Sequence, residues 1–520
     1  MYKNKNIGGL LLFFLCFLPI KAKDWDWKKI DTSVNAVSFE NKKSKDPFLF
    51  GVVTFSHGCE GEDGASVKPH NQWKKFEGKE IEIDGKKCKP LPHESGNACE
   101  HYKRYKEDIK LMKDLGFKAY RFSIAWGKVE PKEGTFDEKV LKHYENVCKE
   151  LKKQGIKPIV TLYHYTHPCW FEDKDAFEKK ENIKYFENFC QKVFKHLKKY
   201  VDIWFVFNSF AGSAFTGYSE GLTPPFKKNM QLAVDVLKNI LEAHVRVYHS
   251  LKKIDKSATV GLIKNMLHID PYSTWNPLDK VASGYADTLA NEVIYKFFKK
   301  GILKAWIPMR AKVKYKNKKA IGAFDCVGLN YYSGAYISNF KLHPRSELIA
   351  TQDKICTIYP EGLYMALDQV WNKLAKEFEV PIYVTENGIC TDNEEHRDIF
   401  YKRYLYALSE AVKDKIDVRG YFARSIMDGY EWVQGYTKNY GIYSVDRKTQ
   451  KRVFRKGAQH LIDVVKNHGV GKKDATKITT AKINSAKQKA EKVAAAKPVI
   501  SAEVTKSKVV KKVTPAVVAA

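Results

Sequence analysis

Short, nearly continuous apolar runs alternate with amphipathic stretches along most of the chain. The runs read FLFGVVT, KAYRFSI, KPIVTLYH, DIWFVFN, TVGLIKN, CVGLNYY, PIYVTEN and GYFARSIM, and they end near Thr54, Ser123, His164, Asn208, Asn265, Tyr332, Asn387 and Asp428. Because these runs carry apolar residues at successive positions, they predict parallel strands that are covered on both faces.

The stretches between the runs have helical periodicity. They predict helices over 102–115, 138–154, 182–200, 229–252, 284–300, 362–378, 394–413 and 456–466. Gly116 and Gly155 directly follow the first two, which is the usual end of a helix before a strand. Eight such alternations favour a closed ring over an open sheet, so we expect an α/β fold with a single (β/α)8 TIM barrel over residues 46–469.

The first 22 residues have the pattern of a targeting segment. Lys3 and Lys5 precede an apolar run from Ile7 to Ile20, which is too short to span a bilayer and suits a secretory signal. We therefore expect residues 1–22 to be a signal peptide and the protein to be exported, either periplasmic or secreted.

The formal charge of +30 is spread along the chain and is densest after Val470. Residues 470–520 are rich in Lys and Ala and carry no aromatic residue. This composition predicts a disordered basic tail that could bind an anionic surface or polymer. Without aromatic rings the tail offers no base-stacking platform, so no specific nucleic-acid site is expected.

The ten cysteines do not suggest a metal centre, because no CxxC pair occurs. Cys59, Cys88 and Cys99 could include one disulfide in an oxidising compartment. We expect most of the others to be small buried hydrophobes. No motif implies a metal or an organic cofactor.

Polar side chains gather where the predicted strands end, and this is where barrels of this kind carry their chemistry. They are His164, Asn208, Asn330, Tyr332, Glu386, Asn387 and Asp428. A carboxylate closing a strand as apolar as PIYVTEN is either a structural, salt-bridged group or a catalytic one. The polar neighbours of Glu386 favour catalysis.

Several stretches resemble glycoside hydrolase family 1, the β-glucosidase family. They are HYKRYKEDIKLMKDLGFKAYRFSIAW at 101–126, TLYHYTHPCW at 161–170, VGLNYY at 327–332, PIYVTENG at 381–388 and GYFARSIMDGYEWVQGYTKNYGIYSVD at 420–446. The order and spacing of these pieces also match, and the similarity runs from about Phe48 to Val465.

The resemblance implies a retaining mechanism, in which one carboxylate attacks the anomeric carbon and water then opens the glycosyl-enzyme. It assigns the attacking carboxylate to Glu386, and it assigns Arg121 and Tyr332 to holding that carboxylate ionised. The alternative for Arg121 is a structural ion pair. The resemblance also implies substrate-binding roles, and these fall on His164, Asn208, Asn330, Glu431 and Trp432.

The same resemblance bears on the substrate. Lys438 and Tyr440 match a pair found in members that act on 6-phosphosugars, but a carboxylate at Glu431 would repel a phosphate. We therefore expect a small neutral carbohydrate, of glucose or galactose type, as the partner. The residues do not decide between these two sugars, and they leave the oligomeric state open.

The family's acid/base is the Glu of an Asn-Glu-Pro triplet, and this chain reads Asn208-Ser209-Phe210. A serine hydroxyl is far too weak an acid to protonate a departing alkoxide, so acid catalysis is expected to be impaired. Gly58, Tyr165 and Arg424 also depart from the family pattern, where Gln, Trp and Trp are usual.

Three interpretations follow. The chain is a working retaining glycosidase that acts on activated leaving groups or recruits another acid or an external nucleophile. Otherwise it is a catalytically weak or inactive barrel that binds carbohydrate or protein, or the basic tail is the functional part. His57, His167 and Glu220 are candidate substitute acids, although each is expected to be a surface residue.

Overall fold

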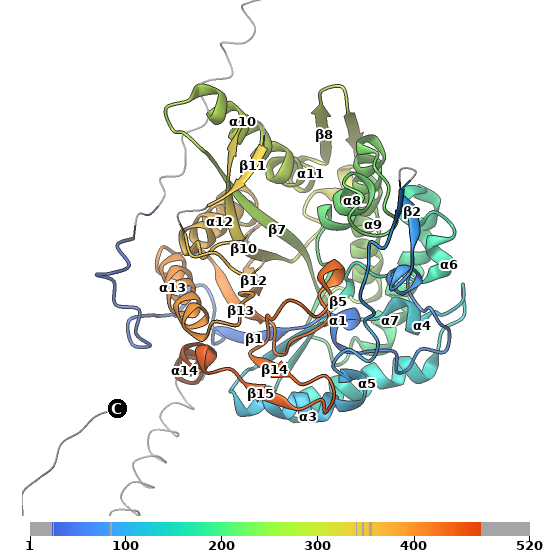
Figure 1. The fold of residues 1–520 in the computed structure, drawn as a ribbon, viewed down its shortest axis with the longest axis horizontal. Helices are drawn as coiled ribbons and strands as arrows, with labels where there is room; N and C mark the ends of the chain where they lie inside the picture. The colour runs from blue at the N-terminus through green and yellow to red at the C-terminus, as the bar shows by residue number, and fades with distance from the viewer. Residues whose placement is uncertain are drawn as a thin grey trace, which may run out of the picture. The chain divides into compact units, whose positions relative to one another are not determined.

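Eight parallel strands close into a ring in the computed structural model, which describes residue 23 and residues 25–83, 86–339, 341–345, 348–352 and 356–469. The pairing of β7 with β10 completes the ring, and helices surround it (Figure 1). The ring consists of β1 (Leu49–Val53), β4 (Ala119–Ser123), β5 (Lys157–Tyr163), β6 (Ile203–Phe207), β7 (Thr259–Pro271), β10 (Cys326–Ser338), β12 (Ile382–Asn387) and β13 (Val418–Arg424). The prediction of a single (β/α)8 barrel is confirmed.

Each barrel strand is followed by at least one helix of the outer layer. These helices are α3 (His101–Asp114), α5 (Glu138–Lys153), α7 (Ile183–Leu197), α9 (Met230–Ile254), α10 (Pro277–Asp287), α11 (Val293–Lys300), α12 (Pro360–Lys373), α13 (Glu394–Lys413) and α14 (Gln459–His468). Asp137, Asn229, Asn276 and Asn393 cap four of them by accepting backbone N–H bonds of the first turn. These caps satisfy donors that a helix leaves without partners, and they fix where each helix begins.

The core has an inner and an outer part, because successive side chains of a strand point to opposite faces. The outer part lies between strands and helices and makes up most of the buried apolar surface. The inner part fills the barrel itself and consists of Val53, Ala119, Ile159, Ile203, Phe205, Ile263, Cys326 and Phe422. With the interior plugged, space for a ligand remains at the carboxyl ends of the strands.

Three strand boundaries and one helix differ from the predictions. The last barrel strand ends at Arg424, not near Asp428, while β7 and β10 continue to Pro271 and Ser338. The helix expected over 284–300 is instead α10, a short π-helical turn and α11. Helix α10 begins early because proline follows the Asn276 cap at the first helical position, where its fixed φ is favourable.

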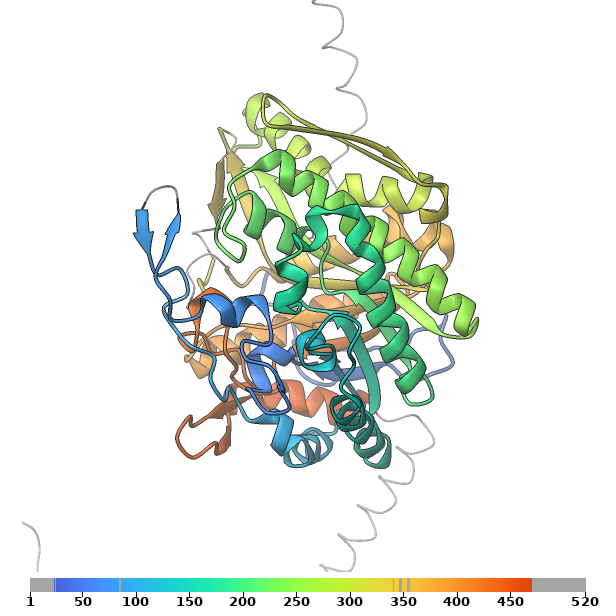
Figure 2. The same ribbon diagram turned by 90° about the vertical axis from the view of Figure 1, so that its right-hand side faces the viewer.

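Small antiparallel elements were not predicted. They are β2 (Ile81–Ile83) with β3 (Lys86–Cys88), β8 (Ile302–Ile307) with β9 (Ala311–Lys316), β14 (Tyr443–Val445) with β15 (Arg452–Phe454), and β11 (Lys341–Pro344) against β10. The β8–β9 hairpin runs along the outside of the helical layer (Figure 2). Strand β9 alternates apolar residues with lysine, whereas β8 is interrupted by the single lysine Lys304.

All nine cysteines of the described residues are free thiols, so no disulfide joins Cys59, Cys88 or Cys99. Cys99 lies in a buried position and donates instead to the carbonyl of Asp428, at 2.9 Å. None of the helices that the structure describes is long and apolar enough to cross a membrane. The predicted signal peptide at 1–22 and the tail at 470–520 lie outside the described residues.

Candidate functional site at the open end of the barrel

Glu386 lies at the carboxyl end of β12 and is 3% exposed. Arg121, from β4, donates from Nη1 to its Oε1 at 2.9 Å, and the hydroxyl of Tyr332 donates to its Oε2 at 2.5 Å. Burial acts to raise the pKa of Glu386, but the charge of Arg121, together with that of Arg424 and the Tyr332 hydroxyl, outweighs it and lowers the pKa. The carboxylate is therefore ionised and fixed in direction at neutral pH.

Asn208, His164 and Asn330 form a second polar layer beside this carboxylate. Asn208 Oδ1 accepts from Nη2 of Arg121 and from Nδ2 of Asn330, the latter at 3.2 Å. Asn208 Nδ2 lies 3.0 Å from Nε2 of His164. Burial lowers the pKa of His164 to about 3, so its imidazole is neutral, and its Nδ1 has no hydrogen-bond partner among the described residues. Neutral polar groups thus converge on Glu386 from three strands.

Arg424, at the end of β13, lies between two carboxylates. Its Nη2 contacts Oε2 of Glu431 at 2.6 Å, and its Nε is 3.7 Å from Oε2 of Glu386. The guanidinium also stacks over the ring of Tyr440, 4.4 Å from the centroid. Burial opposes its charge, but the two carboxylates raise the pKa of Arg424 well above its ordinary value. The sequence identified Arg424 as a departure from the family pattern, but its contact with both carboxylates emerges only from the fold.

Trp432 presents an aromatic platform at the same end of the barrel. Phe55 stacks on it with ring centroids 4.5 Å apart and an interplanar angle of 13°, and His57 stacks at 5.5 Å and 20°. Stacked rings of this kind hold an indole in a fixed orientation. Trp432 is one of the residues that line the cavity containing Glu386.

Ser209 is the second residue after β6, which ends at Phe207, and it is 4% exposed. Its hydroxyl oxygen accepts from the backbone N–H of Gly212 at 3.3 Å, at the start of α8 (Ala211–Tyr218). In this position the side chain helps to begin a helix, and it brings no carboxyl group to the site.

The candidate substitute acids do not line the cavity. His57 and His167 were expected at the surface, but both are 5% exposed, so that expectation is wrong. Each is buried against a carboxylate: His57 Nε2 is 3.1 Å from Glu77, and His167 Nε2 is 2.7 Å from Glu172. Glu220 is exposed and accepts from Ser219 at 2.9 Å.

The cavity has a volume of about 740 Å³, and Glu386 and Glu431 are its two lining carboxylates. Asn265 and Tyr440 also line it, whereas Lys438 donates to the backbone carbonyl of Gln352 at 3.1 Å and does not. The described residues contain no cluster of three or more His, Cys, Asp or Glu that could hold a metal ion.

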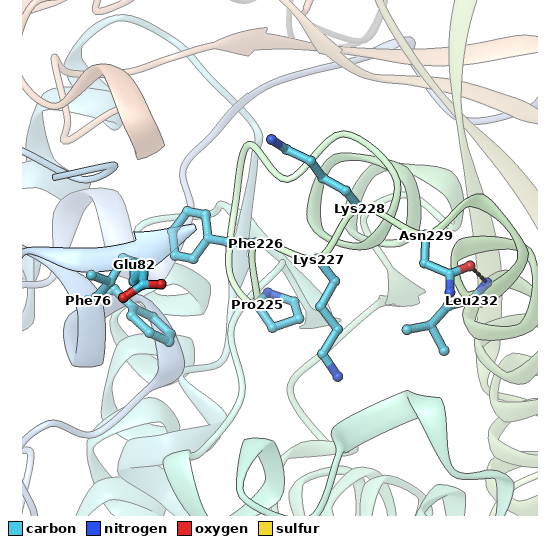
Figure 3. Close-up of a pocket in the computed structure, with 9 residues that line it drawn as sticks. Phe76, Glu82, Pro225, Phe226, Lys227, Lys228, Asn229 and Leu232 are labelled. Carbon is cyan, nitrogen blue, oxygen red and sulfur yellow. Dashed lines mark hydrogen bonds between the residues drawn. The ribbon is translucent and has the colours of Figure 1, made fainter. Parts of the chain in front are cut away.

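A second cavity, of about 520 Å³, lies between the loop at 225–229 and the β2–β3 hairpin (Figure 3). Phe76, Phe226 and Leu232 supply much of its apolar wall. None of the predicted site residues lines it, and Glu82 is its lining carboxylate. Because it lacks a group paired for acid–base or nucleophilic chemistry, the cavity around Glu386 is the candidate active site.

Comparison with known proteins agrees with this geometry. The family model described as Glycosyl hydrolase family 1 matches residues 40–470. The chain belongs to glycosyl hydrolase family 1. This family assignment accounts for the barrel and for the spacing of the five motifs.

The chain is similar over nearly its whole barrel to β-glucosidases and related enzymes. Beta-glucosidase A of Acetivibrio thermocellus is 28% identical over 456 residues, with 81% of this chain and 98% of the relative covered. Beta-glucosidase A of Thermotoga maritima is 28% identical over 468 residues, covering 82% and 99%. The solved β-glycosidase from Pyrococcus horikoshii superposes with a TM-score of 0.71 at 32% identity, covering 83% of this chain and 99% of that one.

Proposed function

We propose that this chain is a retaining β-glycosidase that hydrolyses O-glycosyl bonds of neutral β-glucosides or β-galactosides, with impaired acid catalysis. The observation that carries the proposal is the carboxylate of Glu386, buried in the cavity and held by Arg121 and Tyr332. The similarity to β-glucosidases supports a glycoside hydrolase at the level of the family.

In the proposed mechanism, an oxygen of Glu386 attacks the anomeric carbon while the bond to the leaving oxygen breaks and the leaving group takes the electron pair. The lowered pKa of Glu386 supplies the ionised form that this attack requires. Arg121 and Tyr332 fix the direction of the carboxylate, and water later releases the sugar with the same anomeric configuration. His164, Asn208, Asn330 and Trp432 would contact or support the bound sugar.

Ser209 would limit the first step. The glycosidic oxygen of an ordinary sugar leaves as an alkoxide, which needs a proton that a serine hydroxyl cannot supply near neutral pH. Substrates whose leaving group is already a weak base escape this requirement. We therefore expect useful rates on activated glycosides and slow rates on sugar–sugar bonds.

The charges of the cavity support a neutral sugar. Arg121 and Arg424 are balanced by Glu386 and Glu431, and Lys438 is directed elsewhere. A phosphorylated sugar would meet no unbalanced cation. The similar β-glucosidase of Thermotoga maritima has been solved in complex with glucoimidazole and with galacto-hydroximolactam, which supports keeping both sugar types. Export, as the first 22 residues predict, is part of the same proposal.

One observation favours a second function, a sugar-binding module with little or no turnover. Arg424 contacts Glu431 at 2.6 Å and occupies space beside Glu386. A cation in this place competes with sugar hydroxyls for Glu431. It also adds a second positive charge beside Glu386, which already pairs with Arg121, and so makes the carboxylate a weaker nucleophile. The two functions differ in whether Glu386 forms a covalent bond.

The test is intact-mass spectrometry after incubation with 2-deoxy-2-fluoro-glucosides and galactosides that carry a dinitrophenol leaving group. Dinitrophenolate departs without protonation, so the measurement reports on Glu386 independently of Ser209. We expect a mass gain of one fluorosugar, mapped by peptide sequencing to Glu386.

Two variants serve as matched controls. Glu386→Gln removes the nucleophile with little change in size and should form no adduct. Glu431→Gln alters the other carboxylate of the cavity and should still form one. If the folded protein forms no adduct with either sugar but binds one of them in calorimetry, the hydrolase proposal fails and the binding module stands.

A further inference from the structure

The β8–β9 hairpin and the residues that follow it carry an unusual concentration of positive charge. Residues 302–319 contain no acidic residue and seven cations, which are Lys304, Arg310, Lys312, Lys314, Lys316, Lys318 and Lys319. All seven are exposed, and none forms an ion pair with another residue that the structure describes. This is an uncompensated basic surface that the barrel chemistry does not use.

The cations of the two strands share one face of the hairpin. Leu303, Val313 and Tyr315 point inward, toward the helical layer formed by α9 and α11. The outward face places Lys304 directly opposite Lys314, with Trp306 opposite Lys312. Like charges directly opposite each other destabilise strand pairing. The hairpin keeps this arrangement although its own stability would be better served by a lysine–glutamate pair.

An exposed apolar ridge lies beside these cations. We define it as Trp275, Leu278, Val281, Trp306 and Met309, whose exposed fractions are 92%, 67%, 47%, 63% and 103%. Large hydrophobic residues of soluble proteins are seldom exposed in such a group.

One hydrogen bond links the α10 part of the ridge to the hairpin part. Leu278, Val281 and Tyr285 are spaced so that they share one side of α10. The hydroxyl of Tyr285 donates to the backbone carbonyl of Trp306 at 2.5 Å, which fixes that side of the helix against β8. Helix α10 and the β8–β9 hairpin lie at the same edge of the molecule, the upper edge in Figure 1.

We propose that the ridge and its flanking cations form a docking surface for an anionic phospholipid membrane. Tryptophan, methionine and aliphatic side chains enter the boundary between headgroups and acyl chains, while lysine and arginine beside them contact the anionic headgroups. Met309 is at the tip of the hairpin, between Pro308 and Arg310, where it can enter first. The barrel would then be a peripheral membrane protein.

The charge pattern argues against two other occupants. A second copy docked through the same face would place seven cations against seven, which costs energy in every pair. The phosphates of a nucleic acid could contact the lysines. They would make no apolar contact with Leu278, Val281 and Met309. A bilayer satisfies the cations and the aliphatic residues together.

The test measures binding of the full chain to phosphatidylcholine vesicles with and without phosphatidylserine, by flotation. Lys304→Gln/Lys312→Gln/Lys314→Gln is compared with Lys106→Gln/Lys110→Gln/Lys113→Gln, which removes the same charge from exposed positions on α3. Each lysine near an anionic surface contributes about 1 kcal/mol, so we expect about a hundredfold weaker binding for the hairpin variant and at most a few-fold loss for the control. Equal losses in the two variants would overturn the proposal, since binding would then follow net charge alone.

A second variant, Trp306→Ser/Met309→Ser, separates insertion from charge attraction. We expect it to lose the binding that survives high salt, and to lose part of the tryptophan quenching by brominated lipids. Both variants must unfold at the temperature of the parent.

If the lysine variant weakens binding to a single-stranded oligonucleotide while the Ser variant binds vesicles normally, the surface is a nucleic-acid site. If sedimentation shows dimers that only the Ser variant disrupts, with vesicle binding intact, the partner is a second copy. Either result refutes the membrane proposal.

Discussion

Ser209→Glu is expected to restore turnover of unactivated glycosides. Position 209 follows Asn208, whose side chain is held by Arg121, and Arg121 in turn holds Glu386. An introduced carboxyl is therefore linked to Glu386 through two fixed side chains. Burial at this position and the negative charge of Glu386 would raise the pKa of the new carboxyl, while Arg121 and Arg424 would lower it. A raised pKa is what a general acid requires near neutral pH.

The expected magnitude follows from what a general acid contributes to catalysis. General acid–base catalysis contributes about 10²–10⁴-fold, which corresponds to roughly 3–5 kcal/mol of barrier at about 1.4 kcal/mol per tenfold. That gain applies in full to an alkyl glycoside, because its alkoxide must be protonated. It is nearly zero for a dinitrophenyl glycoside. Losing the 3.3 Å contact to Gly212 is a small cost, at most about 1 kcal/mol of folding free energy.

The assay compares kcat/KM on an alkyl β-glucoside and on its dinitrophenyl counterpart. Ser209→Gln is the control, because glutamine matches the added glutamate in size but its amide cannot act as an acid. We expect the ratio of the two substrates to change by 10²–10⁴ in the Glu variant alone. The reasoning is refuted if the Glu and Gln variants are indistinguishable on the alkyl glucoside while both still form the fluorosugar adduct.

Two further predictions concern buried cations. Arg424→Trp should release Glu431 from its 2.6 Å ion pair and add an aromatic face to the cavity. We expect about tenfold tighter binding of a neutral glycoside by calorimetry, and a loss of up to roughly 3–5 kcal/mol in the free energy of unfolding, because Glu431 loses its partner. Lys264 is 6% exposed, and burial lowers its pKa to about 7 although Asp287 opposes the shift. Its folded pKa is below its unfolded value of 10.5, so the unfolded state binds more protons between about pH 7 and 10.5, and stability rises with pH in that window. Lys264→Met should abolish this rise and stabilise the protein at pH 7 by up to about 5 kcal/mol in urea unfolding. Parallel pH profiles for the two proteins would show that Lys264 is charged in the folded state.

The barrel was predictable because its signal is local and repeated. The burial of each of the eight apolar runs and eight amphipathic segments can be predicted from the residues of that segment alone. The strands close into a ring because every apolar run must be covered on both faces. The boundaries that failed have local causes too. The start of α10 depends on the Asn276 cap and the proline after it, while β9 carries a lysine at every second position and so lacks an apolar run.

The sequence by itself determined which chemical groups are present: a carboxylate at Glu386, a serine at position 209, and an arginine at position 424. Tertiary structure decided what those groups touch. Arg121, Tyr332 and Glu386 come from three strands far apart in the chain, and only closure of the barrel brings them within hydrogen-bond distance. The same closure places Arg424 between two carboxylates and fixes α10 beside the basic hairpin. Periodicity reports whether a side chain is buried, but it carries no information about which distant residue the side chain will meet.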